Sequence, residues 1–141
     1  MKFPYKLIPL SEKSEIFGFS ILRPIIPVKL FGKAIEFEYE VLIDSGADFC
    51  IFDGELGDAL GLDVKTGHIE IFGGVQDTGS STAYLHYIKI SIGGKQMEVP
   101  ALFSYGIAKN GYGILGQRGF FDRFVVRFDY LAREVEVKPK V

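Results

Sequence analysis

The residues best suited to chemistry are Asp44-Ser45-Gly46-Ala47, a short polar run inside an apolar stretch. It follows Val41-Leu42-Ile43 and precedes Asp48-Phe49-Cys50-Ile51-Phe52. A buried strand thus delivers a carboxylate, a hydroxyl and a glycine into a tight turn. A carboxylate held this way can take a proton from a water molecule. An ordinary surface turn has no need of apolar chain on both sides.

The segment before this turn, residues 34–43, is predicted to be a strand. Its apolar side chains at positions 35, 37, 39 and 41 alternate with glutamates at 36, 38 and 40, which is the period of a half-buried strand. The segment after it, residues 53–61, is the one good helix candidate. Asp53 can cap its first turn, and Gly61 can close it in the left-handed conformation.

The rest of the chain predicts short strands separated by glycine-containing turns. Strands are expected at 69–72, 84–92, 96–103, 124–128 and 134–137, with Gly93-Gly94 as a hairpin turn and 107–113 as a loop. The apolar segment 16–30 is interrupted by Pro24 and Pro27. It is therefore expected to form edge strands or a kinked strand. Seven or more strands with one short helix predict an all-β domain, a closed or nearly closed barrel. Residues 1–15 are expected to form an N-terminal arm, and 16–141 the domain.

Two further segments could act together with the Asp44 turn. Ile114-Leu115-Gly116, followed by Phe120-Phe121, provides an apolar strand that ends in a glycine, and glycine permits close approach of backbones. In the sequence between the Asp44 turn and this strand, residues 73–82 are rich in Gly, Ser, Thr and Asp. This composition indicates a loop or a hairpin tip.

These three features, in this order, resemble the retropepsin-like aspartic proteases, the single-domain type found in retroviruses and in cellular relatives. The resemblance runs from about Val28 to Val137, most of the chain. It implies an aspartic endopeptidase that needs no cofactor and no metal. In that chemistry one carboxylate activates water while a second, protonated carboxyl polarises the peptide carbonyl. Two carboxylates about 3 Å apart cannot both ionise, so they share one proton.

One retropepsin-like chain supplies one such aspartate, so the resemblance implies a homodimer with a two-fold axis that acts on a peptide or protein substrate. The catalytic residues it implies are Asp44, Ser45 and Gly46. The substrate-binding residues it implies are Ala47, Asp48, Gly73, Gly74, Val75, Gln76 and Ile114, of which Gly73 to Gln76 would form the tip of a flap.

The sequence departs from the retroviral pattern in one place. An arginine usually follows the glycine of the second segment and supports the catalytic loop. Here Gln117 follows Gly116, and Arg118 comes one residue later. A pair between Asp48 and Arg118 therefore stays open at this point.

The same residues allow other interpretations. Asp77-Thr78-Gly79 repeats the triplet, but no apolar strand leads into it, and a two-lobed enzyme would need about twice this length. Asp44 could be a simple turn residue, or part of a cation site with Asp48 and Asp53. Neither interpretation accounts for the apolar flanks and the two further segments. A dimerisation or peptide-binding module with this fold, with little or no proteolysis, is the main alternative function. A protease that processes only itself or one partner is a third.

Composition sets the remaining bounds. The chain has 141 residues with a formal net charge of -2, which does not suggest a nucleic-acid surface. Cys50 is the only cysteine, and no internal disulfide can form, which favours a reducing compartment. No apolar run approaches the ~18 residues of a membrane span, and the N-terminus lacks the apolar core of a signal peptide. A cytoplasmic protein without a membrane partner is predicted.

Overall fold

The structure is a computed structural model that describes residues 1–72 and 81–140. In chain order its elements are β1 (Lys2–Pro4), β2 (Lys6–Ser14), β3 (Gly18–Arg23), β4 (Ile25–Phe31), β5 (Glu36–Ile43), β6 (Ile51–Asp53), α1 (Gly54–Ala59), the 3₁₀ helix η1 (Val64–Thr66), β7 (His68–Phe72), β8 (Ser81–Ile92), β9 (Lys95–Ser104), the 3₁₀ helix η2 (Tyr105–Asn110), β10 (Gly113–Leu115), β11 (Phe124–Asp129) and β12 (Glu134–Pro139). Strands therefore dominate, and the all-β prediction with one short α-helix is confirmed.

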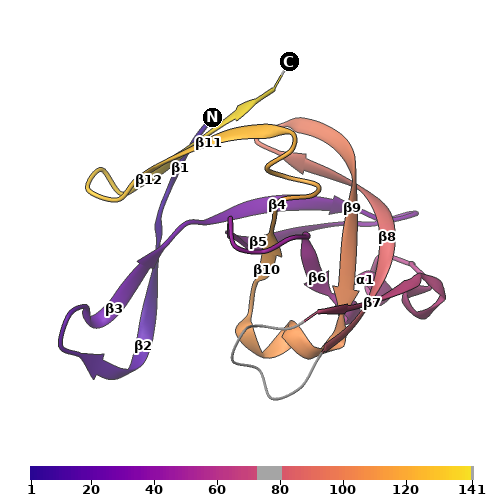
Figure 1. The fold of residues 1–141 in the computed structure, drawn as a ribbon, viewed down its shortest axis with the longest axis horizontal. Coiled ribbons are helices and arrows are strands. Elements are labelled where there is room, and N and C mark those ends of the chain that lie inside the picture. The colour runs from indigo at the N-terminus through magenta and orange to yellow at the C-terminus, as the bar shows by residue number, and fades with distance from the viewer. Residues whose placement is uncertain (73–80, 141) are drawn as a thin grey trace.

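Six strands close into a barrel (Figure 1). Their order is β4-β5-β10-β6-β9-β8, and β4 pairs back onto β8 through residues 29–31. β7 adds to the outer edge of β8. β10 lies between β5 and β6, parallel to the first and antiparallel to the second. The barrel thus brings two segments about 70 residues apart in sequence to adjacent positions.

The side chains of β5 alternate between solvent and core, as the sequence predicts. Glu36, Glu38 and Glu40 are exposed, while Val41 and Ile43 are buried in the barrel core. The core also holds large aromatic side chains with almost no exposed surface, namely Phe52, Phe103, Phe120 and Phe124. Fully burying a side chain of this size stabilises the fold by roughly 1.5–3 kcal/mol. The core therefore fixes the strand that leads into the Asp44 turn.

The helix forms where the sequence predicts it. The Asp53 carboxylate accepts the backbone N–H of Glu55 at 3.0 Å, and Gly61 follows the helix with a φ of +87°. Such an N-cap contributes about 1 kcal/mol. The helix continues directly from β6 and so anchors the chain that leaves the Asp44 turn.

Pro27 lies inside β4, which is not a free edge strand. It pairs opposite Glu40 of β5 on one side, but the pairing of β4 with β8 begins only at Lys29. The missing N–H of Pro27 is tolerated because no strand pairs with β4 there on that second side.

Two further sheets lie outside the barrel. β1, β12 and β11 form a three-stranded sheet that crosses the barrel near both termini, and β2 with β3 forms a two-stranded hairpin that projects away from it (Figure 1). Residues 2–4 and 6–14 are therefore strands, and residue 15 lies in the turn of this hairpin. Residues 107–110, expected as part of a loop over 107–113, belong to η2.

Candidate active site

Asp44 occupies the first position after β5. Its backbone N–H donates to the carbonyl of Leu115 at 3.0 Å, and its own carbonyl accepts the N–H of Ala47 at 3.2 Å, which closes a tight turn. Its carboxylate oxygen Oδ1 accepts the N–H of Gly46 at 2.9 Å. The turn therefore fixes the direction of this carboxylate. Asp44 is half-buried, whereas Ser45 and Gly46 are exposed.

The strand β10 supports the turn from the side. Ile114 pairs with Leu42 and Leu115 with Ile43, in parallel register, so the two strands end together. Gly116 follows at the point of closest approach. A Cβ there would overlap the carbonyl oxygen of Phe49 and lie 2.7 Å from that of Ala47. The expectation that this glycine allows close packing beside the turn is confirmed.

Gln117 holds the turn in a way that the sequence did not reveal. Its side-chain Nε2 donates to the carbonyl of Ser45 at 2.7 Å, and its backbone N–H donates to the carbonyl of Ala47 at 2.8 Å. The only signal in the sequence was its place directly after Gly116, where the retroviral pattern has an arginine. A glutamine amide supplies the donor that such a position needs.

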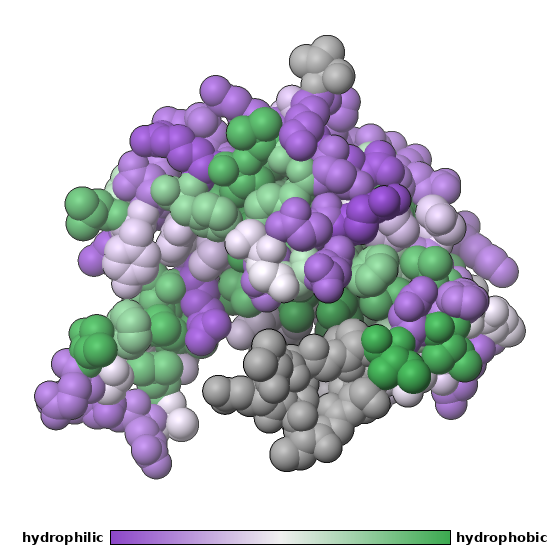
Figure 2. Space-filling view, viewed as in Figure 1, coloured by the Kyte–Doolittle hydropathy of each residue, from purple (hydrophilic) through white to green (hydrophobic). Residues whose placement is uncertain are grey.

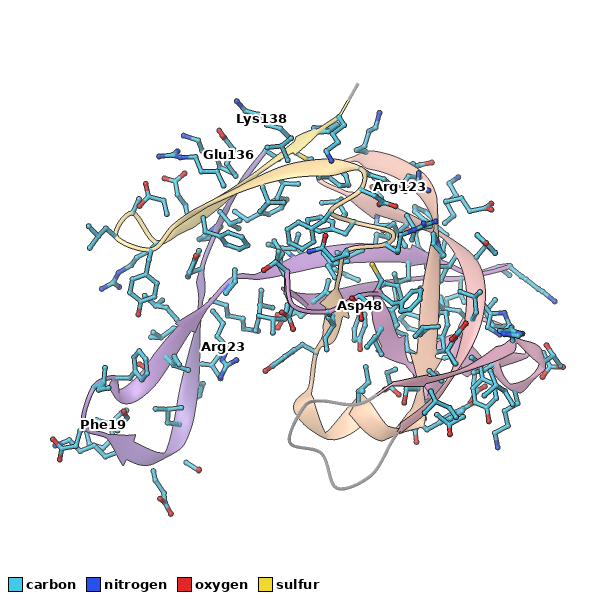
Figure 3. The ribbon with its side chains drawn as sticks, in the orientation of Figure 1. Phe19, Arg23, Asp48, Arg123, Glu136 and Lys138 are labelled. Atoms are coloured by element: carbon cyan, nitrogen blue, oxygen red, sulfur yellow. The ribbon has the colours of Figure 1, made fainter. Side chains whose placement is uncertain are left out.

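Arg118 contacts Asp48 through the backbone. Its N–H donates to the carbonyl of Asp48 at 2.9 Å, while its guanidinium Nε lies 3.5 Å from the carboxylate of Asp122. Asp48 itself is exposed, on the loop that leaves the turn, near the middle of the view in Figure 3. Among the described residues, the side-chain ion pair of Arg118 is thus with Asp122 and not with Asp48.

The predicted site residues fall into two groups. Asp44 to Asp48 and Ile114 lie together at the ends of β5 and β10, and Ile114 is half-buried against the cluster of Ile51 and Leu102. Gly73, Gly74, Val75 and Gln76 lie outside the described residues, as does Asp77. The strands on either side of that segment, β7 and β8, pair antiparallel up to Phe72 and Ser81.

Cys50 lies just after the turn and is fully buried. Its thiol donates to the carbonyl of Arg118 at 3.4 Å. Burial raises the pKa of this thiol to about 12, so the neutral, unreactive form prevails near neutral pH. Cys50 therefore packs as a small apolar residue, as predicted, and does not serve as a nucleophile.

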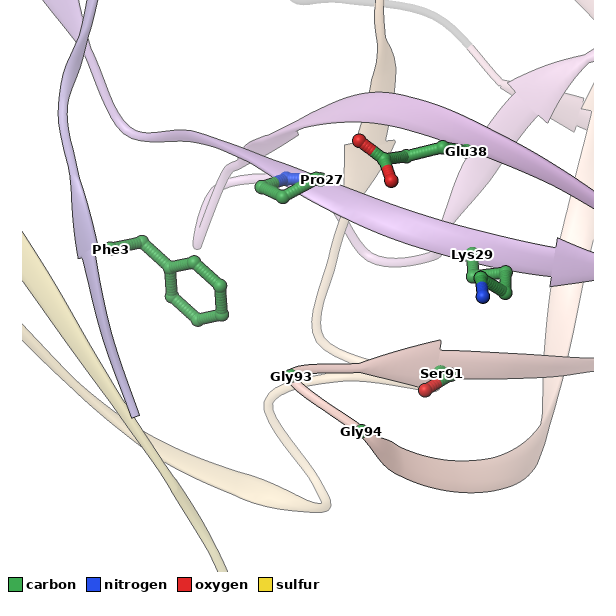
Figure 4. Close-up of a pocket in the computed structure, with 7 residues that line it drawn as sticks. All are labelled: Phe3, Pro27, Lys29, Glu38, Ser91, Gly93 and Gly94. Atoms are coloured by element: carbon green, nitrogen blue, oxygen red, sulfur yellow. The ribbon is translucent and has the colours of Figure 1, made fainter.

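One surface cavity of about 240 Å³ lies away from these residues (Figure 4). Phe3 of β1 closes one side, and Pro27 and Lys29 of β4 face it across the opening. It exists because β4 has no pairing to β8 beside Pro27. Its lining includes no residue of the Asp44 turn.

No group of three or more His, Cys, Asp or Glu side chains among the described residues is placed to hold a metal ion. Within residues 1–72 and 81–140, no helix has the length and apolar character needed to cross a membrane.

Solved structures include chains with a similar fold. A retropepsin-like aspartic protease from Rickettsia conorii has a similar structure, with a TM-score of 0.59 and 17% identity over 94% of this chain and 98% of that chain. The EIAV protease in complex with the inhibitor HBY-793 gives a TM-score of 0.48 and 18% identity over 75% of this chain and 88% of that chain. No curated protein sequence matches the chain.

A family model described as aspartyl protease matches residues 26–118. That match contains the Asp44 turn, β10 and Gly116, and it covers more than half of the sequence. The resemblance to retropepsin-like aspartic proteases is thereby confirmed. This chain belongs to the aspartyl protease family and has the retropepsin-like fold.

Proposed function

We propose that this chain is an aspartic endopeptidase that acts as a two-fold homodimer, with one water held between the Asp44 carboxylates of both copies. The observation that carries the proposal is the Asp44 turn. The barrel strand β5 ends directly before this residue, and β10 fixes its backbone through the carbonyl of Leu115. The N–H of Gly46 donates to its carboxylate at 2.9 Å and so orients it. A simple turn aspartate would not need a parallel strand and a buried glycine beside it.

A single chain supplies only half of the chemistry. Among the described residues of the turn, Asp44 is the one whose carboxylate accepts a hydrogen bond from the backbone of the turn. Asp48 lies at an exposed position on the loop that follows. Metal-free peptide hydrolysis by carboxylates needs a base and an acid together. Since Ser45 and Gly46 lie at the surface of one chain, a second copy can meet the turn across a two-fold axis.

The proposed reaction proceeds through a tetrahedral intermediate. The ionised carboxylate removes a proton from water as the water oxygen bonds to the peptide carbonyl carbon, while the protonated carboxyl donates to the carbonyl oxygen. The newly protonated carboxyl then gives its proton to the amide nitrogen and the C–N bond breaks. As the carbonyl re-forms, a hydroxyl of the intermediate returns its proton to the other carboxylate, so the two carboxyls share one proton again. The pair titrates as one unit.

The substrate-binding residues remain proposals. An extended peptide can lie across the two turns as an added strand, hydrogen-bonded to Ala47 and Asp48. Ile114 is half-buried at the end of β10, which suits one wall of a side-chain pocket. The segment of Gly73, Gly74, Val75 and Gln76 is proposed to cover the peptide as a flap.

Dilution is expected to abolish cleavage. If each active site contains Asp44 from two copies, activity per chain must fall once the concentration drops below the dimer dissociation constant. Cleavage of a peptide library, measured beside sedimentation velocity over the same concentrations, tests this. Reconcentration should restore activity, which excludes loss by adsorption. A monomer with full activity contradicts the proposal, and a stable dimer that cleaves no peptide favours the peptide-binding module.

Gln117→Met is expected to lower kcat about 2- to 10-fold, because one hydrogen bond to the turn is lost. The change keeps the side-chain volume and removes the donor that reaches Ser45 at 2.7 Å. KM and the melting temperature should change little. Gln96→Met, at an exposed position on β9, is the matched control and should leave kcat unchanged. Equal changes of kcat in the two variants would show that the Gln117 side chain does not support the turn.

A further inference from the structure

The β2–β3 hairpin exposes unusually many large apolar side chains. Ile16 is 85% exposed and Phe19 72%, and Leu7 and Phe17 are also exposed. Leu131, in the turn between β11 and β12, is 95% exposed. Figure 2 shows hydrophobic surface on the projecting hairpin and at the tip of that turn, and Figure 3 shows Phe19 at the outer part of the hairpin. Apolar patches of this kind usually mark an interaction surface.

The hairpin and the β11–β12 turn form one continuous groove. The N–H of Tyr5 donates to the carbonyl of Arg133 at 2.8 Å, and the ring of Tyr5 meets that of Tyr130 edge-on with centroids 6.0 Å apart. These contacts fix the first strand of the hairpin against the turn. The resulting groove, of about 370 Å³, is lined in large part by Leu7, Ile16, Phe17, Leu22, Tyr130 and Arg133.

A single chain covers the hairpin only in part, with Ile8, Ile21 and Leu22 half-buried. Leu7 pairs opposite Leu22 and Ile8 opposite Ile21, so both faces of a two-stranded ribbon carry apolar side chains. Its register is also irregular between Pro9 and Ser14. A two-stranded hairpin is marginally stable in water on its own. Contact with another surface would therefore stabilise it.

The base of the hairpin is joined to the Asp44 end of the barrel. The N–H of Ile43, the residue before Asp44, donates to the carbonyl of Pro24 at 3.0 Å, directly after β3. Lys6, the first residue of β2, forms an ion pair with Glu40 of β5. A molecule that meets the Asp44 turn therefore also lies next to the root of the hairpin.

We propose that the hairpin groove, defined as β2, β3 and residues 130–133, is a contact surface for the second copy of this chain. The inference rests on the proposed function, because that function requires a partner at the Asp44 turn and the root of the hairpin adjoins that turn through Pro24 and Ile43. The charges suit a self-complementary contact. Glu12 and Glu15 are exposed on the hairpin, and Arg133 is exposed in the turn between β11 and β12, so each copy offers both signs to its partner.

The test compares two double variants by sedimentation equilibrium. Ile16→Ser with Phe19→Ser removes apolar side chains from the hairpin, and the dimer dissociation constant is expected to rise roughly 100-fold. Ile35→Ser with Tyr87→Ser is the matched control, because these side chains are 47% and 66% exposed but lie on other strands and turns of the barrel. Its dissociation constant should change less than about threefold. Both are also made with Asp44→Asn, so that self-cleavage cannot affect the measurement.

Hydrogen exchange on the unaltered chain gives a second measurement that does not depend on how the variants fold. Amides of residues 6–23 should gain protection as concentration rises through the dimer range. Three results overturn the contact: a parent that stays monomeric, equal dissociation constants for the hairpin variant and the parent, or an equal loss in the control. The proposed function fails separately if a dimer with the hairpin contact cleaves no peptide.

Discussion

Asp44→Asn is expected to lower kcat/KM for peptide cleavage by roughly 10³-fold or more. An amide cannot take the proton from water, so the attack loses its base. The fold should stay intact, because the Asn side-chain oxygen can still accept the N–H of Gly46 that Asp44 accepts at 2.9 Å. Digestion of a peptide library beside circular dichroism and thermal melting measures both effects.

Two controls sharpen this experiment. Asp63→Asn removes an exposed carboxylate that makes no capping hydrogen bond to η1, and it should leave cleavage unchanged. Asp77→Asn tests the second triplet in the sequence and should also retain activity. Equal cleavage by Asp44→Asn and the parent would refute the proposed mechanism.

Mixing the parent with Asp44→Asn tests whether the site is shared. If each active site needs Asp44 from both copies, random pairing in an equal mixture leaves roughly one quarter of the dimers with two native carboxylates. Activity per total chain should then fall to about a quarter of the parent value. A fall to one half would show that each chain works alone.

Gly116→Ala is expected to destabilise the fold by about 3 kcal/mol, which corresponds to roughly 10 °C in the melting temperature. The new Cβ would overlap the carbonyl oxygen of Phe49 and crowd that of Ala47 at 2.7 Å. Both are backbone atoms and cannot move aside as a flexible side chain would. Since they belong to the chain that leaves Asp44, cleavage should decline as well.

Gly106→Ala is the matched control for this substitution. Its Cβ would meet only the hydroxyl of Ser104, at 3.7 Å, and its backbone does not require positive φ. Thermal unfolding at equal chain concentration should show a change within about 1 kcal/mol. A Gly116→Ala protein as stable as this control would show that the turn and β10 can separate at little cost.

The sequence by itself determined the local elements. The alternation in β5, the Asp53 cap of α1 and the Gly93-Gly94 turn between β8 and β9 all formed where they were predicted. Each depends on residues close together in the chain, so side-chain period, capping and positive φ are sufficient to specify it. The position of Asp44 at the end of a buried strand followed from the same local rules.

Only the tertiary structure decided the contacts between distant segments. It set β10 in parallel beside β5. It also placed the amide of Gln117 against the carbonyl of Ser45, at a position where the retroviral pattern has an arginine. It also paired β2 with β3, so that the chain on both sides of residue 15 forms one hairpin. Local sequence patterns do not specify such long-range pairings, because strand partners and hydrogen-bond donors are chosen by barrel closure and by which backbone groups remain unsatisfied.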